Sequence, residues 1–218
     1  MKCDFFQVHC FNSHETVQSL NSIGSGRDIY LIDNSMTGEM KRYARRNDRH
    51  IIWIRPNVKY RAIHPTHSAE LLSLPDAWNL ALSSVQTPWA VNVNPDVMLN
   101  VGSVEVIEKA VDRAIDAGAV VAVSTLGFNI WACDVKAILG LGGFDSRFWP
   151  CAGEEEDLLI RIGQSGLKWG RFNVGAYHVD GGHLSRSDGG RNVETFRAKW
   201  GFHPHSEEYK AIVQQVGL

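Results

Sequence analysis

Short apolar runs alternate with amphipathic helical patterns in the first half of the chain, and this alternation constrains the fold more than any other feature. The pattern predicts strands at residues 3–9, 28–33, 51–54, 89–93 and 119–124. It predicts a first helix with Ser13 as its N-cap, and further helices over residues 75–86 and 103–117. Strands and helices in this order form a mainly parallel sheet with helices on both faces. The sequence therefore predicts an α/β fold.

Glycines and aromatic residues crowd the chain after residue 125. Further helices are predicted at residues 154–166, 192–200 and 206–216. The stretch 175–191 is rich in Gly, His, Ser and Arg, which is typical of a loop.

Polar clusters follow three of the predicted strands. They are Asp33-Asn34-Ser35, Arg55-Pro56-Asn57 and Asn94-Pro95-Asp96. Ligands of open α/β sheets bind at the carboxyl ends of the strands. The three clusters therefore predict a ligand site at that edge.

Charge and apolar content exclude several classes of protein. The 218 residues carry 22 basic and 24 acidic side chains, a net charge of -2 that argues against binding to nucleic acid. No run of about 18 apolar residues is present, so no transmembrane segment is expected. The first ten residues lack the apolar centre of a signal peptide. The four cysteines show no CxxC spacing, which favours reduced thiols in the cytoplasm.

Asp96 is the first candidate metal ligand, because a carboxylate at the ligand-binding edge can hold Mg²⁺ or Mn²⁺ and, through it, a diphosphate. The alternative is an ordinary turn, since Asn-Pro-Asp is good turn chemistry. His178 and His183 are candidates to join Asp96, although structural roles are open for both. Arg186 and Arg191 could clamp a diphosphate or be solvated surface residues.

Four successive acids, residues 154–157, begin a predicted helix. One explanation is that they complement the helix dipole. The other is catalytic: a carboxylate pushed toward an apolar pocket beside other carboxylates has a raised pKa and can act as a base. Glu154 and Asp157 share one face of this helix, and Glu155 lies on the face of Leu158.

These residues resemble the GT-A fold glycosyltransferases, especially the large inverting family that uses nucleotide-diphosphate sugars. The likeness runs in chain order over about residues 3–190. The family's metal motif is usually Asp-x-Asp, so Asn94 replaces its first acid, and Asp96 matches the acid that usually touches metal. The resemblance assigns nucleotide-sugar binding to Asn12, Asp33, Asn34, Asn57, Asn79 and Asn94.

Two longer elements of the family occur in the second half. Residues 142–148 match Gly-Gly-Phe-Asp-x-x-Phe, and residues 154–161 match Glu-Asp-x-Asp-Leu-x-x-Arg. The family's catalytic base is the second acid of the latter element and falls on Glu155, a Glu where Asp is usual. The extra methylene moves the carboxylate, so Glu154 and Glu156 stay candidates, and Asp157 completes the acidic set assigned to catalysis. Its late metal-binding His maps to His178 or, less well, to His183.

The resemblance implies a single domain, residues 1–218, with a nucleotide-binding half (1–100) and an acceptor and catalytic half (101–218). It implies a Rossmann-like sheet with a small mixed acceptor-side region. The implied activity is an inverting hexosyltransferase that moves a sugar from a UDP- or dTDP-sugar to a hydroxyl of a glycan or glycoprotein, assisted by Mn²⁺ or Mg²⁺. The chain also loosely resembles the N-terminal domain of enzymes with which chlorella viruses glycosylate capsid protein, which would place it in the host cytoplasm.

Two other functions remain open. A sugar nucleotidyltransferase shares the sheet architecture but needs a basic, Gly-rich phosphate loop after the first strand, and residues 24–27 come too late for it. A non-catalytic module that binds sugar nucleotides or glycans would bind a donor without turnover.

Overall fold

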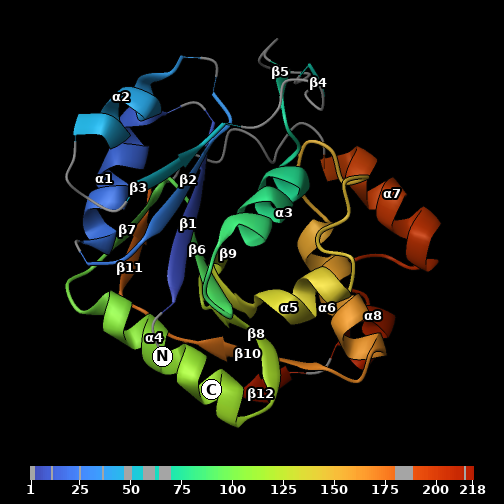
Figure 1. Cartoon of the computed structure of the whole chain (residues 1–218). Coiled ribbons are helices and arrows are strands. Elements are labelled where there is room, and N and C mark those ends of the chain that lie inside the picture. Colours follow the sequence, from blue (N-terminus) through green and yellow to red (C-terminus); the bar gives the residue numbers. More distant parts are fainter. Residues whose placement is uncertain are drawn as a thin grey trace.

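The central feature of the fold is one eight-stranded sheet (Figure 1). The computed structural model describes residues 3–10, 12–24, 26–35, 37–46, 51–55, 62–63, 70–179, 189–213 and 215–218. Within these residues the strand order is β12-β10-β8-β9-β6-β1-β2-β3. The strands are β1 Asp4–His9, β2 Ile29–Asp33, β3 Ile51–Ile54, β6 Trp89–Val93, β8 Ala119–Ser124, β9 Gly127–Asp134, β10 Lys168–Phe172 and β12 Gln215–Gly217.

All but one of these strands run in the same direction. The exception is β9, which pairs antiparallel with both β6 and β8. It follows β8 through a tight turn in which Gly127 has φ 70°, a left-handed conformation that suits glycine. The predicted α/β fold with a mainly parallel sheet is thereby confirmed.

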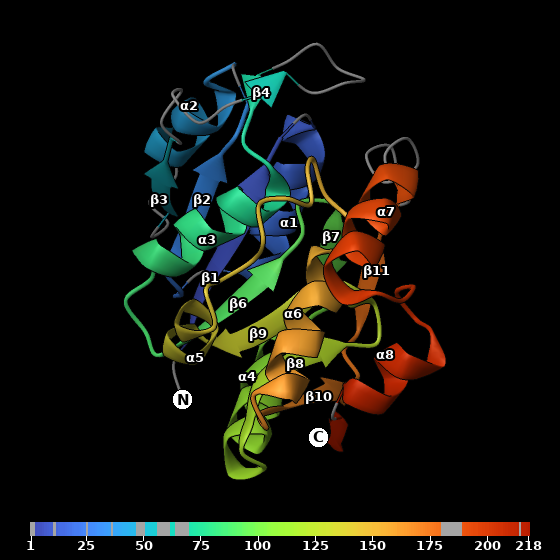
Figure 2. The same ribbon diagram turned by 90° about the vertical axis from the view of Figure 1, so that its right-hand side faces the viewer.

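Helices cover both faces of the sheet, as Figure 2 shows. On one face lie α1 Ser13–Ile23, α2 Glu39–Arg46 and α4 Ser103–Asp116, and on the other lie α3 Leu74–Ser84, α5 Val135–Gly140 and α6 Glu154–Gln164. Successive strand residues serve opposite faces, because side chains alternate across a strand. Phe5 joins the apolar cluster beneath α1 and α4, whereas Phe6 joins the one beneath α3 and α6.

The carboxyl-terminal part forms a smaller layer beside α6. It contains α7 Gly189–Trp200 and α8 Glu207–Ile212, which bury Phe196 against Phe148 and Ile160. The sequence predicted one helix over residues 206–216, but the chain leaves the helix after Ile212 and enters β12. The predicted helix at residues 192–200 begins earlier, at Gly189.

Two short antiparallel pairs lie outside the main sheet. They are β7 Val97–Leu99 with β11 Ala176–His178, and β4 Ala62–Ile63 with β5 Glu70–Leu71. The first pair matters for function, because it brings residue 178 opposite Val97, directly after the Asn94-Pro95-Asp96 turn.

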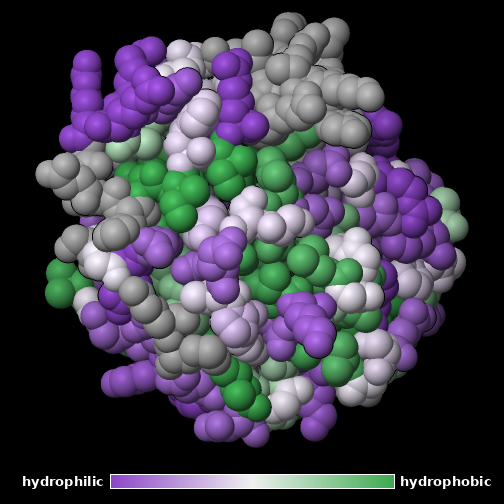
Figure 3. Space-filling model, viewed as in Figure 1, coloured by the Kyte–Doolittle hydropathy of each residue, from purple (hydrophilic) through white to green (hydrophobic). Residues whose placement is uncertain are grey.

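The surface of the described residues is largely polar. In Figure 3 hydrophilic side chains gather over the region of α2, whose outer face carries Arg42, Arg45 and Arg46. None of the described helices is both long and apolar enough to span a bilayer. The four cysteines, all among the described residues, form no disulfide.

Candidate active site

Asp96 and His178, which lie 82 positions apart in the sequence, come together at the carboxyl edge of β6. Asp96 sits in a turn closed by a hydrogen bond from the Val97 N–H to the Asn94 carbonyl (3.0 Å). The Val179 N–H donates to the Asp96 carbonyl (2.8 Å), which holds the end of β11 against this turn. The Nε2 atom of His178 lies 3.1 Å from Oδ2 of Asp96.

The other carboxylate oxygen of Asp96, Oδ1, is buried and has no hydrogen-bond partner among the described residues. A buried oxygen without a partner is costly, so Oδ1 is suited to bind a ligand. Carboxylate oxygen and imidazole nitrogen are suitable donors for Mn²⁺, and the oxygen also suits Mg²⁺. The described residues hold no cluster of three or more His, Cys, Asp or Glu side chains around a metal position.

Asn94 stabilises this turn through its own side chain. Its Oδ1 accepts from Asn92 Nδ2 (2.9 Å), and its Nδ2 donates to Asn129 Oδ1 (2.8 Å). An amide has a donor and an acceptor to serve two such neighbours, whereas a carboxylate has no donor. This explains structurally why an Asn occupies a position where the resembling family has an acid.

Asp33 lies at the ends of β1 and β2 and is buried. Its Oδ1 accepts from the Ser35 N–H (3.2 Å) and hydroxyl (2.6 Å), and its Oδ2 accepts from the indole N–H of Trp53 (2.9 Å). A carboxylate has about four lone-pair positions, so Asp33 can still accept from a ligand. Trp53 was missed by the sequence reasoning, because a Trp at a strand end carries no polar signal.

His9 is a second buried polar residue at this edge. It pairs with Asp33 in the β1–β2 register, and its Nδ1 lies 2.7 Å from the Thr16 hydroxyl. Burial lowers the pKa of His9, although the Asp33 carboxylate opposes the shift. The ring is therefore neutral near pH 7, and its Nε2 is buried without a partner among the described residues.

Three predicted nucleotide-sugar ligands use their amide groups inside the protein. Asn12 caps α1 by accepting from the Glu15 N–H (3.2 Å), a position that the sequence had given to Ser13. Asn34 pairs with both backbone groups of Leu72 (2.9 and 3.0 Å). Asn79 does the same with Phe144 (2.8 Å for both bonds). These contacts give all three residues structural roles, and their roles in binding a nucleotide sugar stay predictions.

The other predicted site residues are only partly described. Asn57, His183 and Arg186 lie outside the described residues. Arg191 lies in the first turn of α7 and is exposed.

The acids at the start of α6 have different surroundings. Glu154 is 1% exposed, and its Oε2 has no partner among the described residues. Burial raises the pKa of Glu154 to about 8, with a contribution from the neighbouring Glu156 carboxylate. Near pH 7 this side chain is therefore largely protonated.

Asp157 is fully buried and fully partnered. It accepts from Arg161 Nε (2.9 Å) and Trp200 Nε1 (2.9 Å), and it forms an ion pair with Lys199 (2.5 Å). Lys199 also pairs with Asp145 (2.7 Å), which ties the 142–148 loop to α6 and α7. These contacts make Asp157 an anchor for three elements.

Glu155 lines a cavity of about 440 Å³ between α6, α8 and the sheet. Burial raises the pKa of Glu155, and the neighbouring Glu154 and Glu156 carboxylates raise it further. The cavity is also lined by Trp169, Arg171, His205 and Tyr209. A raised pKa in a cavity of this size is typical of a functional carboxylate.

The cavity lies beside the Asp96 turn. Gly127 and Phe128 line it. The next residue of β9, Asn129, accepts two hydrogen bonds from Asn94, one at its backbone carbonyl (2.9 Å) and one at its Oδ1 (2.8 Å). Arg171, His205 and Tyr209 could not be found from the sequence, because only the folded chain brings them to the same cavity.

The backbone just before α6 is strained. Ala152 has φ 83° and Gly153 has φ 97°, so two successive residues are left-handed. A non-glycine residue in this region costs about 1–2 kcal/mol, and such strain tends to occur at functional sites. A Cβ on Gly153 would lie 2.8 Å from the Phe148 ring, so the chain requires glycine there. This conformation sets the direction in which α6 begins, and with it the positions of the four acids in its first turn.

Comparison with known proteins identifies the fold. No family model and no curated protein matches the sequence. Among solved structures, a mannosyltransferase (PcManGT) from Pyrobaculum calidifontis with GDP-Man and Mn²⁺ matches with a TM-score of 0.64, 12% identity, and coverage of 84% of this chain and 58% of that one.

Two further structures match as well. S. aureus TarS 1–349 with UDP-GlcNAc has a TM-score of 0.65, 10% identity and coverage of 96% and 69%. GalNAc-T7 with UDP, GalNAc and Mn²⁺ has a TM-score of 0.66, 13% identity and coverage of 96% and 49%. The chain therefore spans about half to two thirds of the length of these structures. It has the GT-A fold of nucleotide-sugar glycosyltransferases.

Proposed function

We propose that the protein is an inverting glycosyltransferase that moves a sugar from a UDP- or dTDP-sugar to a hydroxyl of a glycan or glycoprotein. The single observation that supports this most is the meeting of Asp96 and His178 at the carboxyl edge of the sheet, with one buried carboxylate oxygen unpartnered. The acids in the first turn of α6, beside the same edge, would supply the general base for the acceptor hydroxyl.

The donor would lie along the carboxyl ends of β1, β2 and β6. Asp33 would accept a hydrogen bond from the nucleotide base, and Asp96 with His178 would hold Mn²⁺ or Mg²⁺ on the diphosphate. The metal, when bound, neutralises the charge that develops on the leaving diphosphate. Asn94 keeps the turn of Asp96 in place through Asn92 and Asn129.

Glu155 would act as the general base. Glu155 faces a cavity, whereas Glu154 is buried and Asp157 is held by Arg161, Lys199 and Trp200. An acceptor hydroxyl can therefore reach Glu155. The hydroxyl gives its proton to Glu155, its oxygen bonds to the anomeric carbon, and the bond from that carbon to the diphosphate breaks with inversion.

Two variants test this function. Glu155→Gln is expected to lower donor turnover by about 10²- to 10⁴-fold, because it removes the base. Turnover is measured as release of the nucleoside diphosphate in the presence of Mn²⁺. The variant should keep Mn²⁺-dependent thermal stabilisation by the donor. Near-full turnover in Glu155→Gln would show that the base is elsewhere.

Asp96→Ala should lose the Mn²⁺-dependent part of that stabilisation, whereas the exposed control Glu105→Gln should keep it. If Asp96→Ala still binds donor equally well with Mn²⁺, the metal assignment is wrong. Donor binding without any turnover in the unaltered protein would instead favour a non-catalytic binding module.

A further inference from the structure

Arg171 is an exposed cation at the cavity that contains Glu155. It lies on β10, and its guanidinium carbon is 5.6 Å from the centre of the Trp169 ring. Stacking of this kind restricts the orientation of a guanidinium without satisfying its hydrogen-bond donors. No carboxylate among the described residues lies within ion-pair distance of Arg171.

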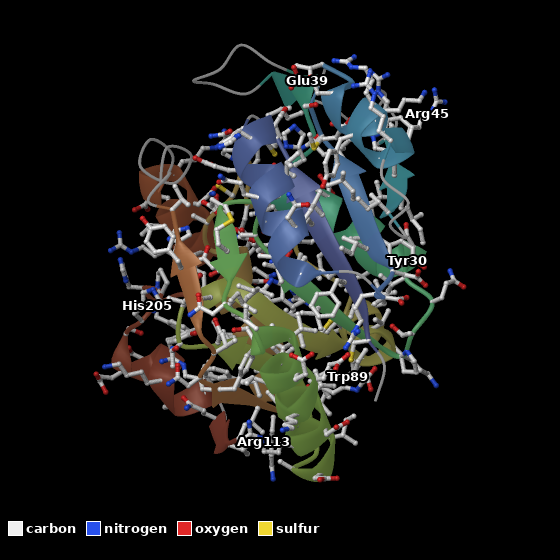
Figure 4. All side chains as sticks on the ribbon, turned by 90° about the vertical axis from the view of Figure 1, so that its left-hand side faces the viewer. Tyr30, Glu39, Arg45, Trp89, Arg113 and His205 are labelled. Atoms are coloured by element: carbon white, nitrogen blue, oxygen red, sulfur yellow. The ribbon has the colours of Figure 1, made fainter. Side chains whose placement is uncertain are left out.

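The other charged groups at this cavity have partners. His205 Nε2 lies 3.1 Å from Glu156 Oε1, and Lys210 pairs with the exposed Glu207 (2.6 Å). Figure 4 shows His205 near the edge of the molecule remote from α2 and Arg45. Among the charged lining residues that the structure describes, the guanidinium and the Glu155 carboxylate are left without an ion-pair partner.

These two unpaired groups do not neutralise each other, although they line one cavity of about 440 Å³. Burial and the Glu154 and Glu156 carboxylates raise the pKa of Glu155, and Arg171 does not offset this. A guanidinium that is oriented by stacking and has free donors is suited to bind a planar carboxylate or a phosphate through two hydrogen bonds. The cavity thus presents a carboxyl group that can take the proton of a hydroxyl and a cation that can bind an anion.

We propose that this cavity binds an acceptor sugar that carries an anionic substituent, with the anion on Arg171 and the accepting hydroxyl toward Glu155. This inference rests on the proposed function for its assignment of the cavity to the acceptor. Trp169 holds the guanidinium in place, and Glu155 takes the proton of the hydroxyl. A carboxylate and a phosphate share the chemistry that Arg171 recognises.

Equilibrium binding of three probes tests the proposal: glucuronic acid, glucose 6-phosphate and glucose. Titrations use the whole chain with Mn²⁺ and nucleoside diphosphate. At least one of the two anionic sugars is expected to bind about tenfold more tightly than glucose, the size of one charge-assisted hydrogen bond. The two anionic arms distinguish a carboxylate from a phosphate.

Arg171→Gln should remove this preference. The matched control, Lys168→Gln, removes one exposed positive charge from the same strand outside the cavity lining and should leave the preference intact. Circular dichroism checks that both variants fold. Equal affinity for charged and neutral sugars, no binding of either anionic sugar, or an unchanged preference in Arg171→Gln would overturn the proposal.

Nucleoside diphosphate binding in the same samples separates the two hypotheses. If the nucleotide fails to bind with Mn²⁺, the proposed function fails. If the nucleotide binds and the charge preference is absent, only the anionic acceptor is excluded.

Discussion

Replacing Glu154 with Gln is expected to remove one part of the pH dependence of folding stability. Glu154 is 1% exposed, its Oε2 has no partner among the described residues, and burial raises its pKa to about 8 from an ordinary value of 4.5. The folded protein therefore keeps a proton that the unfolded chain releases. The free energy of unfolding contributed by this group falls as the pH rises from 4.5 to about 8 and levels off above that range.

The size of the effect follows from one proton held over this interval. Each pH unit within it costs about 1.4 kcal/mol, so between about pH 5 and pH 7 the unaltered protein loses about 2.5 kcal/mol through Glu154. Gln cannot ionise, so the variant lacks this loss. The difference in unfolding free energy, variant minus unaltered protein, should therefore increase by about 2.5 kcal/mol over the same range.

Urea denaturation followed by tryptophan fluorescence, at both pH values and equal ionic strength, measures this difference. Glu105→Gln on α4 is the control, because that side chain is exposed. A change below about 0.5 kcal/mol between the two pH values would refute the reasoning, since it would mean that Glu154 ionises in the folded protein as it does in the unfolded chain.

Two other substitutions test the loop that leads into α6. Asn79→Ala should lower the unfolding free energy by about 1–3 kcal/mol, because it leaves both backbone groups of Phe144 without partners. Urea denaturation measures this loss. A loss as small as that of the exposed Ser83→Ala would contradict the role of Asn79. Gly153→Ala should cost at least about 1–2 kcal/mol from its φ of 97° alone, and more from the Phe148 ring at 2.8 Å. A thermal melt indistinguishable from that of the unaltered protein would show that the loop can relax.

The sequence could predict the strands of the first half because they are continuous apolar runs. The predicted strand at residues 119–124 coincides with β8, and the one at 89–93 coincides with β6. The strand β9 could not be found, since Gly127 and its aromatic neighbours have the composition of a loop and its antiparallel pairing with β6 is a long-range contact. Residues 215–216 were wrongly assigned to a helix for the same reason, because they become a strand only through their pairing with β10.

Local sequence patterns identify only some of the residues of the candidate site. Asp96 and His178 were both candidates, and the structure brings them within 3.1 Å, but no sequence pattern could choose between His178 and His183. The metal and catalytic roles stay predictions. The indole bond from Trp53 to Asp33 and the free guanidinium of Arg171 depend on tertiary packing, which has no periodic signature.

The pairing of β9 with β6 has a consequence for modularity. β9 comes from residues after 100 and β6 from residues before 100, so their pairing crosses the boundary that the sequence predicts between a nucleotide-binding half and an acceptor half. Cutting the chain there would leave each fragment with an open strand edge, which is a template for aggregation. Halves of two such proteins can therefore be exchanged only if the β6–β9 register is kept. Donor and acceptor preferences would then have to change by substitutions within the sites and not by swapping one half for another.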